Sequence, residues 1–360
     1  MNIQEEIKKF PTTRYQGSKR KIIPWVYDCI KDIEFNTVLD AFGGSGMVSY
    51  LFKKMGKVVT YNDFLLFNQI IGDSIISNNK VLLTELDVKY ILDRKAKTEN
   101  FITDNFCNIY YLEEENLWID RIIHNIESLS KKYSRNELRY KKAIAYNALF
   151  QSCLIKRPYN LFHRKNLEMR TRDVHRNFGN KTTWDTSFRD HFKKFVCEIN
   201  KSIYNSRVQC RAINQDALMM NNVDYDLVYI DSPYVKNSGN NENSDYLRCY
   251  HFLEGIAKYS DWSNLIDNTT INKQIRKNAL PNYFTPKEAI NTFEKLVAKF
   301  RNSILVISYK YGGSPSIEEL TKILHKYKQN VRIHDKHYKY ALNKQNGDAV
   351  LNREYILIGY

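Results

Sequence analysis

The sequence of 360 residues lacks several patterns that mark common protein classes. Its six cysteines never form a C-x-x-C pair, and its eight histidines show no metal-ligand spacing, so neither a zinc site nor a disulfide framework is indicated. No stretch approaches the roughly 18 continuous apolar residues of a membrane-spanning helix, and the N-terminus has no apolar secretion signal. We therefore expect a cytoplasmic protein with free thiols, no metal and no membrane partner.

Internal repeats and linkers rich in proline, or in glycine and serine, are also missing. With 43% apolar residues, the chain can bury a substantial core. Lys and Arg outnumber Asp and Glu by 55 to 40, and the resulting charge of +15 favours a polyanionic partner. The chain is also rich in Lys, Asn, Ile and Tyr, a bias that an AT-rich genome produces by itself. Charge alone therefore does not identify the partner.

Helix and strand patterns alternate in the first part of the chain. Residues 37–42 and 57–63 have strand patterns, and the helical pattern of residues 46–56 lies between them, which is the order of a parallel βαβ unit. From residue 79 to residue 199 the apolar spacing is helical. Strand patterns return at 207–216, 225–231 and 302–309, and residues 337–360 predict two strands joined by a turn at Asn346-Gly347.

This order predicts one α/β domain, formed by residues 1–78 and 200–360, with a helical insertion at residues 79–199. The sheet is expected to be mostly parallel, with an antiparallel hairpin at the C-terminus.

The stretch DAFGGSG, residues 40–46, places Asp40 and three glycines between a predicted strand and a predicted helix. Glycines at such a turn let the backbone and the helix N-terminus approach a ligand closely. The full G-x-G-x-x-G fingerprint is not present, because Ser49 takes the third position, and the P-loop pattern is absent. A nucleotide-type ligand and a simple tight turn both remain open for this stretch.

Asp63 ends the second predicted strand. In a doubly wound sheet an acidic residue there can accept hydrogen bonds from the ribose of a bound nucleoside, although a helix N-cap is an equally good reading. Upstream, RYQGSKRK at residues 14–21 reads by itself as the solvated basic start of a helix.

The stretch YDLVYIDSPY, residues 225–234, is a buried-strand pattern that ends on Asp231, Ser232, Pro233 and Tyr234. The lone pair of an exocyclic amine is delocalised into its ring, so an enzyme that acts on this amine must localise the lone pair. A carboxylate from Asp231 and the backbone carbonyl of Ser232 could accept the two N–H hydrogens, while Pro233 stiffens the turn and Tyr234 offers a stacking face. An ordinary turn after a strand is the alternative interpretation.

Taken together, the order RYQGSK, DAFGGSG, YND, a long insertion, NQD and IDSPY resembles the Dam-like, alpha-group DNA adenine methyltransferases, which use S-adenosylmethionine. The resemblance implies a Rossmann-like methyltransferase sheet. It also implies that Asp231, Ser232, Pro233 and Tyr234 form the catalytic tetrad, in which Ser232 replaces the usual first proline. The cofactor residues implied in the same way are Tyr15, Gly17, Lys19, Asp40, Phe42, Gly43, Gly44, Ser45, Gly46, Asp63 and Asp216.

A basic segment from residue 156 to residue 184 lies within the insertion and carries interleaved aromatic residues. Basic side chains can neutralise phosphates, and Arg can read base edges in the major groove, although a solvated charged face is the simpler reading. Given the resemblance, we expect target recognition here, on double-stranded DNA from which the adenine is extruded. The expected DNA contacts are Lys156, Arg157, Arg164, Lys165, Arg170, Arg172, Arg176 and Lys181.

These observations predict a site-specific methyltransferase that modifies adenine N6 in double-stranded DNA, in a restriction-modification or phage and bacterial DNA modification context, with a cognate restriction endonuclease as a possible partner. No proline precedes a cysteine, which excludes the usual cytosine C5 chemistry. Cytosine N4 methylation remains mechanistically open, although Asp231 favours adenine. A nicotinamide-dependent oxidoreductase would leave IDSPY unexplained. A DNA-binding module with an inactive methyltransferase core is the alternative, because of Ser232.

Overall fold

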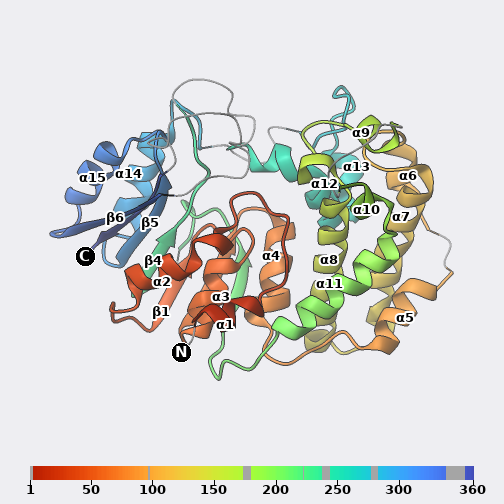
Figure 1. Ribbon diagram of the computed structural model, residues 1–360, viewed down its shortest axis with the longest axis horizontal. Helices are drawn as coiled ribbons and strands as arrows, with labels where there is room; N and C mark the ends of the chain where they lie inside the picture. Colours follow the sequence, from red (N-terminus) through yellow and green to blue (C-terminus); the bar gives the residue numbers. More distant parts are fainter. Residues whose placement is uncertain are drawn as a thin grey trace.

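The structure is a computed structural model that describes residues 3–95, 98–172, 180–221, 223–236, 244–276, 283–337 and 353–360. A seven-stranded sheet with helices packed on it forms one part of the molecule, and a group of helices lies beside it (Figure 1). Among the described residues, no helix has the length and apolar character needed to cross a membrane.

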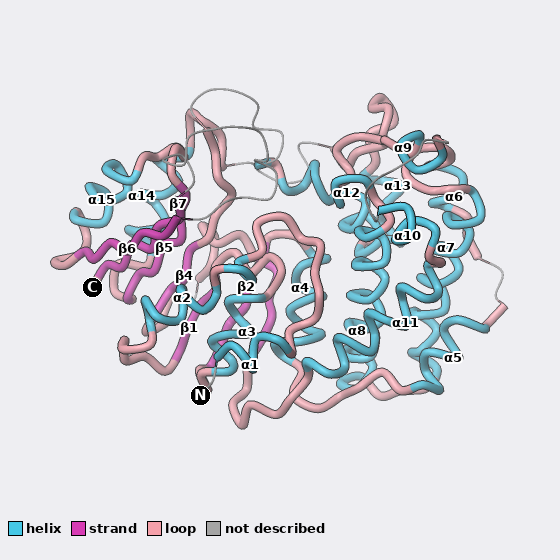
Figure 2. The backbone as a smooth tube through the Cα atoms, in the orientation of Figure 1, coloured by secondary structure: helices cyan, strands magenta, loops and turns pink. Residues whose placement is uncertain are grey.

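The sheet has the strand order β3-β2-β1-β4-β5-β7-β6, and Figure 2 shows the strands as one twisted layer. The strands from β3 to β5 pair in parallel, whereas β7 is antiparallel to both of its neighbours. The predicted mostly parallel sheet with an antiparallel hairpin is therefore confirmed. The strands are β1 (Thr37–Asp40), β2 (Val58–Asp63), β3 (Arg211–Asn214), β4 (Leu227–Ile230), β5 (Ile304–Lys310), β6 (Val331–His337) and β7 (Arg353–Gly359).

Alternate residues of each central strand enter two different cores. In β1, Val38 faces one core and Leu39 the other. The first core also contains residues of α1 (Ile3–Lys8), α2 (Ile23–Ile30), α3 (Met47–Lys54) and α4 (Leu66–Gly72), and the second contains residues of α14 (Ala289–Lys299) and α15 (Ile317–His325). Because both faces are covered, β4 is apolar and buried at every position.

Strand β1 lies between β2 and β4. After β1 the chain forms β2 and β3 on one side of it, and later β4 and β5 on the other side. Parallel sheets bind ligands at such a switch point, beyond the carboxyl ends of the strands. The register aligns Asp40 with Tyr61 of β2 and with Tyr229 of β4. The residues that end these three strands therefore meet at one edge of the sheet.

The helical part is built around α8 (Arg135–Ile155), whose C-terminal half is buried. It also contains α5 (Glu85–Asp93), α6 (Phe101–Asn105), α7 (Glu113–Glu127), α9 (Glu168–Thr171), α10 (Asn180–Asp185) and α11 (Phe188–Ser202).

Two later helices, α12 (Tyr246–Ala257) and α13 (Trp262–Leu265), lie against this part (Figure 1). They do so because Phe252 and Trp262 pack on Phe106 of the insertion, with ring centroids 5.1 and 5.0 Å away. The helical part therefore draws on two separate stretches of the chain, of which the sequence indicated only the first.

The C-terminal hairpin begins earlier than predicted. Its first strand, β6, starts at Val331 instead of near residue 337, and it pairs with β7 from Val331 opposite Gly359 to His337 opposite Arg353. Strand β6 is an edge strand with mostly exposed polar side chains, so it carries little of the apolar pattern on which the prediction depended. The predicted turn at Asn346-Gly347 lies outside the described residues.

Candidate active site

A cavity of about 820 Å³ lies at the carboxyl ends of β1, β2 and β4. The four residues predicted as the catalytic tetrad line it, as do all the predicted cofactor residues except Gly46. These residues come from the N-terminal segment, from three strands and from the turn after β4. The fold thus brings the separate sequence motifs together around one space.

The glycine loop between β1 and α3 packs tightly against β2. A Cβ atom on Gly43 would lie 2.1 Å from Cε2 of the buried Tyr61. The Tyr61 hydroxyl donates a hydrogen bond of 2.7 Å to the Gly44 carbonyl, and Gly46 has a φ of +81° at the N-cap of α3. The loop is therefore a tight turn, and its backbone is also a wall of the cavity.

Two carboxyl groups are buried beside this loop. Asp40 is 1% exposed, and one of its oxygens accepts a 2.7 Å hydrogen bond from Ser49 Oγ, while Oδ1 has no hydrogen-bond partner among the described residues. Burial raises the pKa of Asp40 to about 7, and the negative charges of Asp231 and Asp63 add to this rise. Asp40 therefore exchanges its proton near neutral pH and presents an unused acceptor.

Asp63 combines the two roles that the sequence left open. Its carboxylate accepts backbone hydrogen bonds from Leu65 and Gly44, each 2.9 Å long, which ties the approach to α4 to the glycine loop. The same side chain lines the cavity. Burial raises the pKa of Asp63 to about 6, although these hydrogen bonds oppose the rise. A carboxylate has about four acceptor positions, so Asp63 can still accept from a ligand.

Two aromatic residues line the cavity together with the predicted carboxylate Asp216. Asp216 accepts a 2.9 Å hydrogen bond from the Leu218 N–H and lines the cavity together with Phe42 and Phe284. The rings of Phe42 and Phe284 meet edge to face, with centroids 5.5 Å apart. These residues offer two aromatic rings and one carboxylate, which suit a planar heterocycle.

The segment RYQGSK does more than begin a helix. The Tyr15 ring stacks on Tyr250 of α12, with centroids 4.8 Å apart and planes 6° apart, and the Tyr250 hydroxyl accepts a 2.7 Å hydrogen bond from Gln16 N–H. Gly17 has a φ of +81°, and a Cβ atom there would lie 2.9 Å from the Tyr246 hydroxyl. Close contact with α12 therefore fixes this segment beside the cavity.

The turn after β4 carries a cluster of close polar contacts. Lys19 Nζ lies 2.8 Å from Oδ1 and 2.7 Å from Oδ2 of Asp231, and 2.8 Å from the Tyr234 hydroxyl. The Tyr234 hydroxyl donates a 2.8 Å hydrogen bond to Asp231. Lys19 and Asp231 keep only 5% and 17% of their side-chain surface exposed. The lysine therefore holds the carboxylate and the tyrosine in one orientation.

Sequence reasoning did not single out Lys310 and Tyr246, which also line the cavity. Lys310 ends β5, and its Nζ lies 5.3 Å from the centroid of the Tyr234 ring. Burial lowers the pKa of Lys310. The strand-end rule that located Asp231 applies equally to the neighbouring strand β5, so the signal for Lys310 was present in the sequence.

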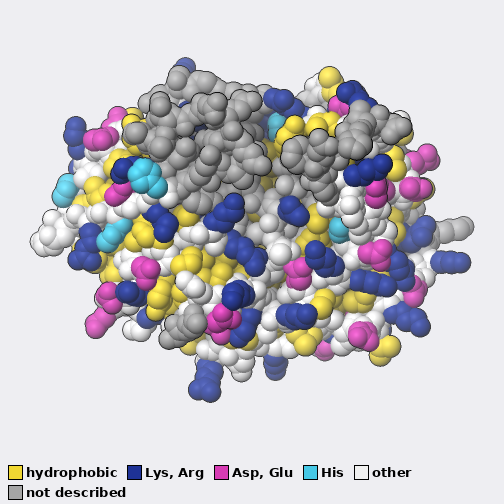
Figure 3. Space-filling model, viewed as in Figure 1, with side chains coloured by type: hydrophobic (Ala, Val, Ile, Leu, Met, Phe, Trp, Pro, Cys, Tyr) yellow, Lys and Arg dark blue, Asp and Glu magenta, His cyan; other side chains and the backbone are white. Residues whose placement is uncertain are grey.

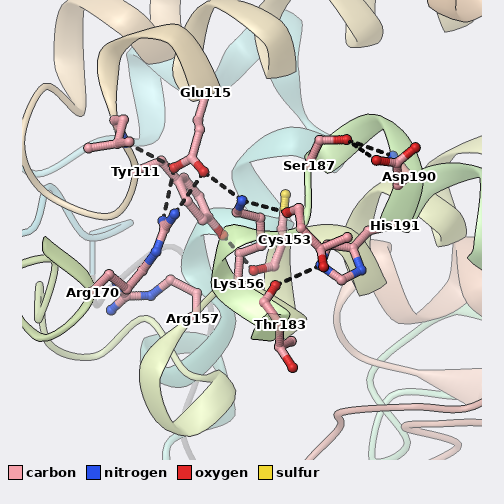
Figure 4. A network of polar contacts seen from close by, with 12 residues as sticks. Tyr111, Glu115, Cys153, Lys156, Arg157, Arg170, Thr183, Ser187, Asp190 and His191 are labelled. Atoms are coloured by element: carbon pink, nitrogen blue, oxygen red, sulfur yellow. Dashed lines mark hydrogen bonds and ion pairs between the residues drawn. The ribbon is translucent and has the colours of Figure 1, made fainter. Parts of the chain in front are cut away.

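The structure divides the basic segment into two groups. Three side chains that were expected to contact DNA point into the protein instead, because they are paired there (Figure 4): Lys156, Arg157 and Arg170. Four others are exposed: Arg164, Lys165, Arg172 and Lys181. Arg176 lies outside the described residues. The expectation of direct DNA contact is therefore corrected for the first three.

On the face shown in Figure 3, lysine and arginine side chains are spread over both parts of the molecule. No single large basic patch is visible among the described residues of that face.

Comparison with known proteins agrees with this geometry. The family profile described as D12 class N6 adenine-specific DNA methyltransferase matches residues 15–312. The chain is 27% identical to the Type II methyltransferase M2.HphI of Haemophilus parahaemolyticus over 355 residues, which cover 95% of this chain and 97% of that protein. It is 26% identical to the Type II methyltransferase M.FokI of Planomicrobium okeanokoites, over 95% of this chain and 52% of that longer protein.

A third relative, the Type II methyltransferase M.NlaIII of Neisseria lactamica, is 21% identical and is matched over 98% of its length. The family match spans the N-terminal segment, the glycine loop, the insertion and the turn after β4, which are the segments that build the cavity. The chain therefore belongs to the D12 class of N6 adenine-specific DNA methyltransferases.

Proposed function

We propose that this methyltransferase transfers a methyl group from S-adenosylmethionine to adenine N6 at a specific site in double-stranded DNA. The observation that carries the proposal is that one cavity is lined both by the glycine loop with Asp40 and by the cluster of Lys19, Asp231 and Tyr234. A methyl donor and an extruded base can thus meet there.

The chemistry of the cavity fits S-adenosylmethionine. Oδ1 of Asp40 is a buried acceptor that can pair with the amino group or face the sulfonium, and the backbone at Gly43 leaves no room for a side chain. Asp63 can accept from the ribose, and Phe42 and Phe284 can enclose the adenine beside Asp216. When bound, S-adenosylmethionine supplies an electrophilic methyl group on a positively charged sulfur.

The turn after β4 would activate the adenine. One N6–H donates to Asp231 and the other to the Ser232 carbonyl, which localises the nitrogen lone pair towards the methyl group. Methyl transfer would leave N6 positively charged, and Asp231 would be placed to accept its proton and pass it to solvent. Tyr234 provides a face on which the extruded base stacks, which offsets part of the unstacking cost of a few kcal/mol.

Serine in place of the first proline of the tetrad is compatible with this role. The proposed acceptor is a backbone carbonyl, which every residue has, and the Ser232 hydroxyl is buried without a hydrogen-bond partner among the described residues. The inactive DNA-binding module thus gains no support from Ser232.

We further propose that the exposed residues Arg164, Lys165, Arg172 and Lys181 contact DNA. The recognition of a specific site within a type II restriction-modification system is supported by the names of the relatives M2.HphI, M.FokI and M.NlaIII. A restriction endonuclease with the same target is then the expected functional partner.

The test uses purified full-length protein, unmethylated genomic DNA and S-adenosylmethionine labelled in its methyl group. Digestion to nucleosides should place the label on N6-methyladenine for the wild type and give none for Asp231→Ala. An Asp335→Ala variant, which removes an exposed carboxylate from β6, should be as active as the wild type. Label on another base, or equal labelling by Asp231→Ala, contradicts the proposal.

A further inference from the structure

The three inward cations, Lys156, Arg157 and Arg170, form an internal clamp in the basic segment. We infer that Glu115 is a positioning residue for DNA recognition: by binding Lys156 and Arg170 from inside, it fixes the loop that presents the outward cations, Arg164, Lys165 and Arg172. This inference rests on the proposed function, because it assigns the outward cations to DNA.

Glu115 joins separate segments of the helical part through one carboxylate (Figure 4). Arg170 of α9 makes a two-pronged contact with it, at 2.7 Å to Oε1 and 2.9 Å to Oε2. Lys156, directly after α8, lies 2.8 Å from Oε1. The Lys156 ammonium also donates a 2.9 Å hydrogen bond to the Thr186 carbonyl before α11. Residues from α7, α8, α9 and the α10–α11 connection are thus held together.

This carboxylate is well buried, with 10% of its side-chain surface exposed, and the side chains of Lys156 and Arg170 are 4% and 6% exposed. Burial opposes ionisation, but the contacts with Arg170 and Lys156 hold the pKa of Glu115 below its usual value. If the carboxylate were removed, the buried side chains of Lys156 and Arg170 would lose their negatively charged partner. A buried cation without such a partner moves towards solvent or forces neighbouring groups to rearrange.

Arg157 secures the other end of the loop. Its guanidinium donates hydrogen bonds of 2.6 Å to the Arg164 carbonyl and 3.2 Å to the Leu161 carbonyl, and it lies over the Tyr110 ring at 4.6 Å. The exposed side chain of Arg164 is therefore attached to a backbone that a buried arginine holds. Arg157 and Arg170 together hold the stretch from residue 157 to residue 170 from within.

The clamped loop is also connected to the wall of the active site. Phe162 N–H donates a 2.8 Å hydrogen bond to the Cys249 carbonyl of α12, and the Phe162 carbonyl accepts a 3.0 Å hydrogen bond from Asn272 Nδ2. The first turn of α12 carries Tyr246, which lines the catalytic cavity. Fixing this loop consequently fixes the distance between the outward cations and the turn that carries Asp231.

Salt dependence of DNA binding separates inward from outward cations. Each phosphate contact that is lost reduces the slope of log K against log salt by about 0.9. Arg172→Met should reduce the slope by about that amount. Arg170→Met should reduce the slope by more than the loss of one contact, because the loop that carries Arg164, Lys165 and Arg172 is released as a unit. A slope for Arg170→Met equal to that of the wild type, or smaller by only about 0.9, overturns the inference.

The second measurement compares Glu115→Gln with the wild type on a duplex that contains the mapped site and on a duplex that lacks it. We expect KM for the site duplex to rise about tenfold or more and discrimination between the duplexes to fall, with kcat and S-adenosylmethionine binding unchanged. Glu115→Asp, which keeps the charge, should recover part of the loss. Wild-type KM in Glu115→Gln overturns the inference.

Asp87→Asn is the matched control. It breaks another buried ion pair of the helical part, in which Lys141 Nζ lies 2.7 Å from Asp87, away from the basic loop. This variant should lose thermal stability and keep its KM for DNA. An equal rise in KM would show that general destabilisation explains the effect.

If Glu115→Gln does not fold, the slope of Arg170→Met decides whether the clamp positions the outward cations. If the wild type binds DNA without methylating it, the proposed function fails while the slopes still test the clamp.

Discussion

Lys19 Nζ lies 2.7 Å from the nearer carboxylate oxygen of Asp231, although 212 residues separate the two in the chain. The ammonium group donates to the carboxylate on which the adenine amine is proposed to depend. Lys19 therefore orients Asp231, and the carboxylate, which accepts from Lys19 and Tyr234, keeps an acceptor position for the proposed N6–H donor.

Replacement of Lys19 by methionine tests this role, because methionine keeps an unbranched stem and removes the donor. We expect kcat to fall at least about tenfold, which corresponds to about 1.4 kcal/mol of transition-state stabilisation. Single-turnover methylation on saturating DNA measures the change. Lys21→Met, which alters an exposed lysine of the same segment, is the control. An unchanged single-turnover rate in Lys19→Met would show that the ion pair is incidental.

The contact between Gly43 and Tyr61 predicts an intolerant position. In Gly43→Ala, the new methyl group would lie 2.1 Å from Cε2 of Tyr61, so the loop has to move away from β2. S-adenosylmethionine affinity, measured by calorimetry, should fall at least tenfold. Gly56→Ala, at a positive φ with open space around it, should cost stability without lowering affinity. Normal affinity in Gly43→Ala would contradict the proposed placement of the cofactor.

The raised pKa of Asp40 predicts a pH dependence of stability. An unfolded aspartic acid ionises near pH 4, whereas burial raises the pKa of Asp40 to about 7 in the folded chain. Between pH 4 and pH 7 the folded chain therefore keeps a proton on Asp40 that the unfolded chain has lost. The contribution of this proton to the free energy of unfolding is fully present below about pH 4 and is lost as pH rises through 7.

Urea unfolding of the wild type and of Asp40→Asn at several pH values between 4 and 8 should show this loss. The wild type is expected to lose free energy of unfolding relative to the variant as pH rises, by an amount on the order of a few kcal/mol. Parallel curves for the two proteins would mean that Asp40 ionises normally.

The same carboxyl group predicts proton release when the cofactor binds. A cationic ligand favours the ionised form of Asp40, so its affinity should rise as pH increases to about 7 and then level off. Calorimetry of S-adenosylmethionine binding at pH 6.5, in buffers of different ionisation enthalpy, measures the released proton. Asp40→Asn should release less; equal release by both proteins would assign the proton to another group.

Ser232→Ala tests whether the serine hydroxyl has a role. The hydroxyl is buried and has no hydrogen-bond partner among the described residues, so its removal should leave kcat within about threefold and raise stability by about 1 kcal/mol. Thermal unfolding and steady-state methylation measure the two effects. A large loss of kcat would show that the hydroxyl, and not only the carbonyl, acts in the reaction.

Much of the cavity could be predicted because its residues lie at the ends of strands. The run from Leu227 to Ile230 is apolar and buried, and the strand-end rule places Asp231 beside Asp40 and Asp63 without knowledge of side-chain contacts. The glycine loop and the N-terminal segment could be recognised because their order along the chain matches that of a family.

The direction of the basic side chains could not be predicted in this way. Arg170 points inward because Glu115, 55 residues earlier, accepts its two hydrogen bonds. A local run of charge contains no information about such a partner. The packing of Phe252 on Phe106 likewise joins distant segments, which is why α12 was not assigned to the helical part.

Strand β6 has a consequence for the behaviour of the enzyme in solution. It forms one edge of the sheet, and Arg332, Asp335 and Lys336 are exposed along it. A strand from another molecule that paired with this edge would have to run beside these charges and strip water from them. The exposed charges thereby disfavour pairing of this edge with the sheet of a second molecule.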